Sequence, residues 1–159
     1  MINWQSKDGP WLYAVAVSSS HFWDYTMSMA ASDITVRWLR GRKMASYSDM
    51  FDEVSAALQF PWYFGGNSAA FDECMADLSW LPPGRIAICI DDLSLVLTKE
   101  SSSEWLEFME QLRGLCQEHA AQGSVYSIRV IANAGESQAV GDDKIRSLGI
   151  SFLAANQAE

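Results

Sequence analysis

Short apolar runs alternate along the chain with longer stretches in which apolar residues recur every three to four positions. The runs at 11–17, 33–39, 85–90 and 127–132 are rich in β-branched and aromatic residues, and they predict strands. The run at 85–90 is apolar at nearly every position, which is typical of a central strand covered on both faces. A weaker run at 150–153 predicts a last edge strand.

Three segments combine helical spacing with clear end signals: one from Ser46 or Ser48 to Leu58, one over 68–79 and one over 101–122. Residues 21–29 have helical spacing but a weak capping signal, so their state is left open, and a short helix is expected around 142–144. Strands that alternate with helices predict an α/β fold. We therefore expect a small parallel or mixed β-sheet covered by helices, in a single domain that spans 1–159.

An aromatic loop and the helix after it form the most informative stretch. The loop is Phe60-Pro61-Trp62-Tyr63-Phe64-Gly65-Gly66-Asn67, in which the glycines shape a turn and Asn67 is expected to cap the next helix. At 3.6 residues per turn, one side of that helix is apolar and faces inward: Phe71, Cys74, Met75 and Leu78. The outward side is a shallow platform formed by Ala69, Asp72, Glu73, Ala76 and Asp77.

This platform carries carboxylates without counter-charges nearby in the sequence. No Lys or Arg lies between Lys43 and Arg85, whereas six acids fall inside the interval: Asp49, Asp52, Glu53, Asp72, Glu73 and Asp77. A solvated helix usually mixes both signs, because alternating pairs stabilise it modestly. We interpret the segment as an anionic surface that receives a cationic partner, with a plain solvated helix face as the alternative.

The composition narrows the classes of partner. The 159 residues are 49% hydrophobic and 19% charged, as in a folded globule, and the formal net charge is −9. Binding of nucleic acid requires Lys and Arg to neutralise phosphates, and the 11 present are scattered, so direct nucleic-acid binding is disfavoured. The acidic excess suits a basic protein partner, or simply solubility.

The expected compartment is the cytoplasm. Cys74, Cys89 and Cys116 are widely spaced and lie in apolar patterns, which favours buried thiols in a reducing environment and disfavours a zinc site. The first residues lack the features of a signal peptide, and the longest apolar run is too short to span a bilayer, so we expect no membrane association.

Residues that support catalysis are sparse. His21 and His119 lie in no motif, and His119 is expected near the polar side of a helix end, where a cation suits the helix dipole. Asp91-Asp92 follows a strand, for which we favour a surface or capping role over a metal site. We expect no enzymatic activity, no cofactor and no metal.

Two further patterns resemble catalytic motifs only superficially. Gly65-Gly66 is followed by acids and by no Lys, so it is not a phosphate-binding loop. Asp72 and Glu73, as neighbours on a helix, point about 100° apart and do not converge on one bond as glycosidase carboxylates do.

Four stretches together resemble the barstar family of intracellular bacterial ribonuclease inhibitors: Arg40-Gly41-Arg42-Lys43-Met44, the acidic helix to Leu58, Phe60-Pro61-x-Tyr63-Phe64-Gly65-x-Asn67, and Leu78-x-Trp80 with the apolar strand beyond. The Pro-x-Tyr-Phe-Gly-x-Asn pattern between two helices is the most specific of these. The resemblance covers roughly 34–132 and leaves extra N- and C-terminal segments outside it.

The resemblance implies a parallel sheet flanked by helices, in which the loop and the following helix plug the active site of a nuclease. The carboxylates would stand in for RNA phosphate. It implies contacts from Tyr63, Phe64, Gly65 and Asn67, from Glu73 at the family's main Asp position, and from Glu118 on the long helix. With the neighbouring loop and platform residues, the candidate partner-binding surface is Trp62, Tyr63, Phe64, Gly65, Gly66, Asn67, Ala69, Asp72, Glu73, Ala76, Asp77 and Glu118.

Two positions depart from the family pattern. Ala69 stands where the family commonly has Asp, and Glu73 replaces a shorter Asp, which moves the charge outward by one methylene. Asp72, at a position that is usually not acidic, offers partial compensation. We interpret these departures as a change of partner.

The leading hypothesis is an immunity or antitoxin protein that occludes the active site of a basic protein toxin in a 1:1 complex. The toxin is expected to be a secreted nuclease, most simply a ribonuclease. The alternative is a binding or regulatory adaptor on the same scaffold that inhibits nothing. A third hypothesis, a small α/β enzyme that uses Asp91 or Asp92 with a metal, is the least favoured.

Overall fold

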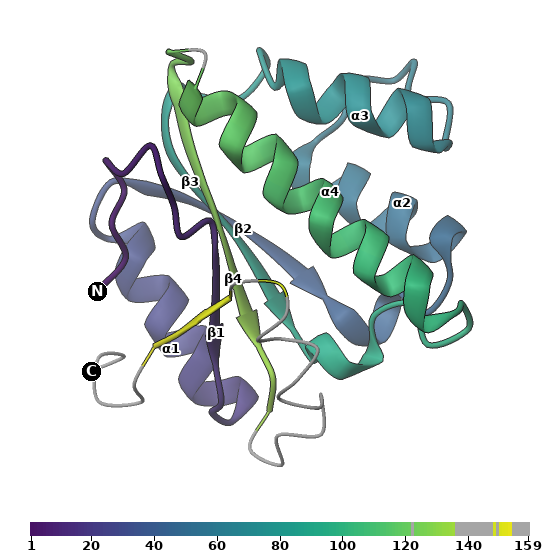
Figure 1. Cartoon of the computed structure of the whole chain (residues 1–159), viewed down its shortest axis with the longest axis horizontal. Helices are drawn as coiled ribbons and strands as arrows, with labels where there is room; N and C mark the ends of the chain where they lie inside the picture. The colour runs from purple at the N-terminus through teal and green to yellow at the C-terminus, as the bar shows by residue number, and fades with distance from the viewer. Residues whose placement is uncertain (122, 136–147, 149, 154–159) are drawn as a thin grey trace.

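The fold is a parallel α/β sheet with helices on both faces (Figure 1). The structure is a computed structural model that describes residues 1–121, 123–135, 148 and 150–153. Within these residues, five strands pair in the order β2-β3-β4-β1-β5, and every pairing is parallel. The strands are β1 (Leu12–Val15), β2 (Ile34–Arg40), β3 (Gly84–Asp91), β4 (Tyr126–Asn133) and β5 (Ser151–Phe152). The expected α/β class is confirmed.

The helices are α1 (Ser19–Ala30), α2 (Tyr47–Leu58), α3 (Ser68–Asp77) and α4 (Ser102–Ala121), with short 3₁₀ turns η1 (Gly41–Lys43) and η2 (Leu93–Leu95). The segment that was left open is α1, which is capped by Ser18. Of the two caps considered for α2, Ser46 is the one used, and it forms a capping box with Asp49. The expected helix around 142–144 lies outside the described residues.

The two faces of the sheet bury different sets of side chains, because successive strand residues point to opposite sides. Leu12 and Ala14 pack into the larger core under α2, α3 and α4, whereas Tyr13 and Val15 pack on the other face with Phe22 of α1. Figure 1 shows α1 on one side of the sheet and α2, α3 and α4 on the other. The site-bearing helices therefore share one layer.

The segment before β1 is tied to the sheet by a buried arginine. Arg129 of β4 donates to the main-chain oxygens of Asn3 and Ser6, each at 2.9 Å, and its guanidinium lies 4.8 Å from the centre of the Trp11 ring. Burial lowers the pKa of Arg129. The N-terminal extension is thus part of the same folded unit as the sheet.

Gly41 follows β2 at a point where two stretches of backbone meet. A Cβ at this position would lie 2.5 Å from the carbonyl oxygen of Asp91 and would also clash with the carbonyl group of Asp92. Only glycine leaves room for this approach of η1 to the end of β3. This close contact accounts physically for the glycine in the Arg40-Gly41-Arg42 stretch.

Candidate functional site

A tight turn presents two aromatic side chains to solvent. The amide of Phe64 donates to the carbonyl of Pro61 at 3.0 Å, which places Trp62 and Tyr63 at the centre of the turn. Their exposed fractions are 95% and 60%, and their ring centres are 6.0 Å apart. A nearly fully exposed tryptophan is unusual in a monomer and is typical of a binding surface.

The base of the loop is anchored by a cluster of phenylalanines. The rings of Phe60 and Phe64 meet edge to face at 5.0 Å, and Phe64 also lies 6.1 Å from Phe51 of α2. Phe60 in turn contacts Phe71 of α3 and Trp80, at 6.0 and 5.9 Å. The loop is therefore held at its base while its tip is exposed, so little conformational entropy remains to be lost on binding.

Helix α3 begins and faces as expected. Asn67 accepts a hydrogen bond from the amide of Ala70 at 3.0 Å, which confirms it as the N-cap. Phe71, Cys74 and Met75 are buried. The exposed residues are those of the expected outward side: Ala69, Asp72, Glu73, Ala76 and Asp77.

The C-terminal end of α3 is held by side chains from α4 and β4. His119 Nε2 donates to the carbonyl of Met75 at 3.0 Å, and Nδ1 lies 2.9 Å from the hydroxyl of Ser124. The hydroxyl of Tyr126 lies within hydrogen-bond distance of the carbonyl of Leu78, at 2.9 Å. His119 lies in the last turn of α4, as expected, but it is buried and not on the polar side of the helix, because α4 packs against α3 there and both ring nitrogens have partners.

Two of the six acids in the cation-free interval are paired in three dimensions, contrary to the sequence-based expectation. Glu53 is buried and takes two hydrogen bonds from the guanidinium of Arg40, each at 2.8 Å. Asp49 lies 3.9 Å from the ammonium of Lys99. The bonds from Arg40 lower the pKa of Glu53, and the hydrogen bond from Ser46 lowers that of Asp49.

The remaining four acids, Asp52, Asp72, Glu73 and Asp77, form no ion pair with any described residue. Asp72 accepts a hydrogen bond from the amide of Gln111 of α4, which orients its carboxylate. The pKa of the buried Cys74 thiol is raised, first by burial and then by the charges of Glu73 and Asp77. The carboxylates on α3 are therefore exposed and not neutralised by described residues.

Glu118 is also exposed, but it belongs to the other end of the surface. It precedes His119, whose ring contacts Met75 in the last turn of α3. A helix of ten residues is about 15 Å long, so Glu118 and the aromatic turn lie at opposite ends of α3. The structure groups the loop residues with the start of α3 and sets Glu118 apart from them.

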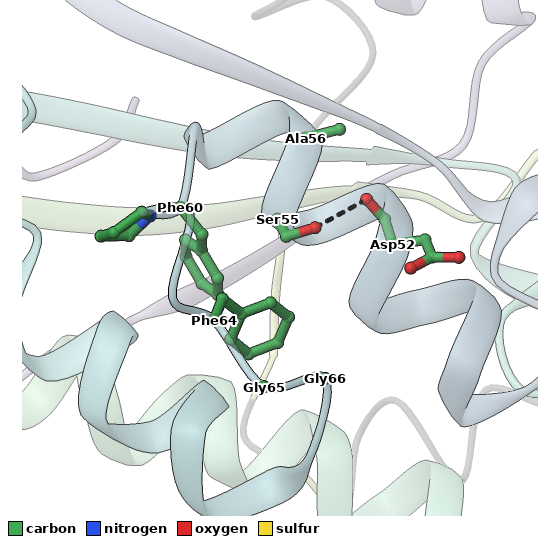
Figure 2. A pocket seen from close by; sticks show the side chains of 8 residues that line it. Asp52, Ser55, Ala56, Phe60, Phe64, Gly65 and Gly66 are labelled. Carbon is green, nitrogen blue, oxygen red and sulfur yellow. Dashed lines mark hydrogen bonds between the residues drawn. The ribbon is translucent and has the colours of Figure 1, made fainter.

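A hollow of about 440 Å³ beside the loop was not expected from the sequence. Figure 2 shows the Phe60 and Phe64 rings on one side of it and Ser55 and Asp52 of α2 on the other. The Ser55 hydroxyl donates to the main-chain carbonyl of Asp52 at 3.0 Å and not to the Asp52 carboxylate. The sequence feature that could have indicated this hollow is the spacing of Asp52, Ser55 and Ala56, because residues three and four apart share one face of a helix.

Asp91 is not a surface or capping residue, as had been expected. It is 2% exposed and accepts a hydrogen bond from Asn133 at 2.9 Å, because the end of β3 lies between β2 and β4. Asp92 lies 3.6 Å from Arg42. No cluster of three or more metal-ligating side chains occurs among the residues that the structure describes.

Comparison with protein families identifies the chain. A family model described as barstar, the barnase inhibitor, matches residues 34–131, which include the loop and α3. The chain belongs to the barstar family.

Comparison with solved structures finds similarities to this barstar-family chain at low identity. A Drosophila origin recognition complex bound to AT-rich DNA and Cdc6 contains a chain that is 12% identical, with a TM-score of 0.50 over 91% of this chain and 48% of that one. A Walker-type ATPase of Pyrococcus abyssi is 9% identical, with a TM-score of 0.49 over 88% of this chain and 44% of that one. This chain thus spans about half the length of these two.

This likeness extends to the fold alone. No curated protein matches the chain in sequence. No helix in the described part of the chain is long and apolar enough to cross a membrane.

Proposed function

We propose that this chain is a stoichiometric inhibitor that occludes the basic active site of a toxin nuclease, most simply a ribonuclease, in a 1:1 complex. The observation that carries the proposal is the exposed Trp62–Tyr63 turn beside the uncompensated carboxylates of α3. Family membership supports the same role.

The proposed mechanism is mimicry of a phosphate backbone. A nuclease site built to hold phosphate is a preformed cationic hollow, and a rigid carboxylate can occupy it in place of the substrate. Asp72, Glu73 and Asp77 would supply the charge, and the alanines between them allow close approach. Trp62 and Tyr63 would add stiff contact area around the ion pairs and exclude water.

The hollow beside the loop extends this surface. A long cationic side chain of the partner would fit between α2 and the loop, with its charge beside Asp52 and its stem against Phe60 and Phe64. The loop would then be gripped from both sides. The three free cysteines are all buried, which fits an inhibitor that acts in a reducing cytoplasm.

The test is inhibition of RNA cleavage. Purified basic bacterial ribonucleases, barnase among them, are titrated with the chain and assayed on a fluorogenic RNA. We expect one of them to be inhibited completely at one equivalent, and its association rate to fall as salt screens the long-range attraction. Failure to inhibit any of them would count against the function, and binding without inhibition would establish the adaptor alternative.

A charge reversal tests the site. Glu73→Lys should weaken the complex at least about tenfold, roughly 1.4 kcal/mol, because it places a cation against a cationic site. Asp24→Lys makes the same change on α1, on the opposite face of the sheet, and should leave affinity unchanged. Equal affinities for the two variants would reject α3 as the interface.

A further inference from the structure

The outer edge of the sheet is formed by β2, whose one neighbouring strand within the described residues is β3. The amide of Arg40 points away from β3, because it donates to the Glu53 carboxylate at 2.9 Å. Successive residues of a strand direct their amides to opposite sides, so Val36 and Trp38 share this outward side. These two amides lie on the open edge of β2.

A hollow of about 350 Å³ lies at this edge, between α1 on one face of the sheet and α2 on the other. One wall is formed by Trp23 of α1 and Trp38, and the other by Ala56 and Ala57 of α2. The two indole rings meet edge to face at 4.9 Å, and Trp23 remains 48% exposed. Trp38 is held in place by a 2.7 Å hydrogen bond from its Nε1 to Thr26. Because Ala56 and Ala57 are small, they leave room for the backbone of an added strand.

Basic residues cluster at this edge and in the turn after it, a grouping that the overall count of scattered basic residues does not show: Arg37 and Arg40 lie on β2, and Arg42 and Lys43 in η1. Four of the 11 basic residues fall within seven positions: Arg37, Arg40, Arg42 and Lys43. Arg40 and Arg42 have acidic partners, but the Nε of Arg37 is buried and has no hydrogen-bond partner among the residues that the structure describes. A buried donor without a partner is costly, so a carboxylate or carbonyl supplied from outside would stabilise it.

We propose that the β2 edge binds an extended acidic segment of another protein as an added strand. Outward amides such as those of Val36 and Trp38 would bind its main chain, and Arg37 would bind an acidic side chain. Alternate side chains would enter the hollow, toward Trp23 and Trp38 on one face and toward Ala56 on the other. The Glu53 bond to Arg40 closes the edge at its end, so the added strand is short.

A second copy of the chain fits this edge less well. Isologous pairing of β2 with itself would bring the arginines of both copies together, and like charges in direct opposition are destabilising. The residues that line the hollow at this edge include none from the loop or α3, but Ala56 of α2 also lines the hollow beside the loop. The two surfaces therefore meet at α2.

The first test uses peptides. A fluorescein-labelled decapeptide of alternating Glu and Val is titrated with the full chain and followed by anisotropy. We expect it to bind at least tenfold more tightly than the same peptide with Lys in place of Glu. It should also bind at least tenfold more tightly than a version N-methylated at alternate residues, in which one edge of the peptide strand can no longer donate main-chain hydrogen bonds. Equal binding of the three peptides, or no binding of the acidic one, would overturn the proposal.

Variants of the edge locate the binding. Val36→Pro removes an outward amide, which an edge strand tolerates, and should abolish peptide binding while circular dichroism is unchanged. If this variant does not fold, Trp23→Ala removes one wall of the hollow from an exposed position and should weaken binding tenfold. Arg37→Glu should reverse the preference from the acidic peptide to the lysine peptide. Unaltered affinities in the folded variants would place the peptide elsewhere and reject the edge.

Sedimentation of the chain alone tests whether the β2 edge binds a second copy of the chain instead. At 100 μM the wild-type chain is expected to remain monomeric. A dimer that Val36→Pro abolishes would show that the edge pairs with a second copy, which contradicts the proposal of an acidic partner segment.

Discussion

The Arg40–Glu53 pair should contribute measurably to stability, and Glu53→Gln tests this. The Glu53 carboxylate is 9% exposed and accepts three hydrogen bonds, two from the guanidinium of Arg40 and one from its amide. Glutamine keeps the shape and one acceptor oxygen but removes the charge. The variant therefore removes the charge and the one hydrogen bond at Oε2, and it keeps an acceptor for the two bonds at Oε1.

The expected loss of stability depends on how far each side chain of the pair is buried. A hydrogen bond to a charged group contributes about 1.5–3 kcal/mol, and the Arg40 side chain is 51% exposed, so solvent screening reduces this. We expect Glu53→Gln to lower the free energy of unfolding by about 1–2 kcal/mol at pH 7. With a urea m-value of about 2 kcal/mol/M, the midpoint should fall by roughly 0.5–1 M.

The pH dependence gives the sharper prediction. The pKa of Glu53 is lowered in the folded chain by the bonds from Arg40. The stabilisation is therefore fully present above the ordinary glutamate pKa and is lost as pH falls through the lowered value, when the folded carboxylate takes up its proton. The difference between wild type and Glu53→Gln should be largest at pH 6–7 and should shrink below about pH 4.

Urea unfolding followed by tryptophan fluorescence, at a series of pH values, provides the measurement. Glu110→Gln is the matched control, because Glu110 also bonds an arginine, Arg113, but both side chains are more than 40% exposed. That change should cost at most about 0.5 kcal/mol. A stability difference for Glu53→Gln that stays constant from pH 7 to pH 3 would refute the assignment to the carboxylate charge.

Two further changes test the backbone around the site by the same unfolding assay. Gly41→Ala should lower the free energy of unfolding by roughly 2 kcal/mol or more, because the new Cβ meets the main chain of Asp91. The control is Gly114→Ala in α4, whose Cβ meets nothing within 4 Å and which should stabilise the chain by about 0.5–1 kcal/mol. Similar effects of the two changes would contradict the close approach at Gly41. Asn67→Ala should cost about 1 kcal/mol through loss of the α3 cap, and Asn67→Ser should restore most of it unless the cap is unimportant.

Features that depend on residues within one helical turn were determined by the sequence alone. The cap at Asn67, the choice of Ser46 or Ser48 for α2 and the inward side of α3 could be predicted because each involves contacts a few positions apart, whereas the structure decided for Ser46. The aromatic loop was found for the same reason, since Pro61 and the glycines constrain the backbone locally. The strands were located by their apolar runs, although the order of a parallel sheet is not encoded in any one of them.

Features that depend on contacts between distant segments were decided by the tertiary structure. Lys99 lies 3.9 Å from Asp49 although the two residues are 50 positions apart, and His119 reaches the end of α3, so neither the pairing of Asp49 nor the burial of that histidine follows from local pattern. The hollow beside Asp52 and the basic edge of β2 likewise exist only once helices and strands have packed. Local hydrogen bonding and periodicity can be deduced from neighbouring residues, whereas pairing and burial depend on the whole chain being in place.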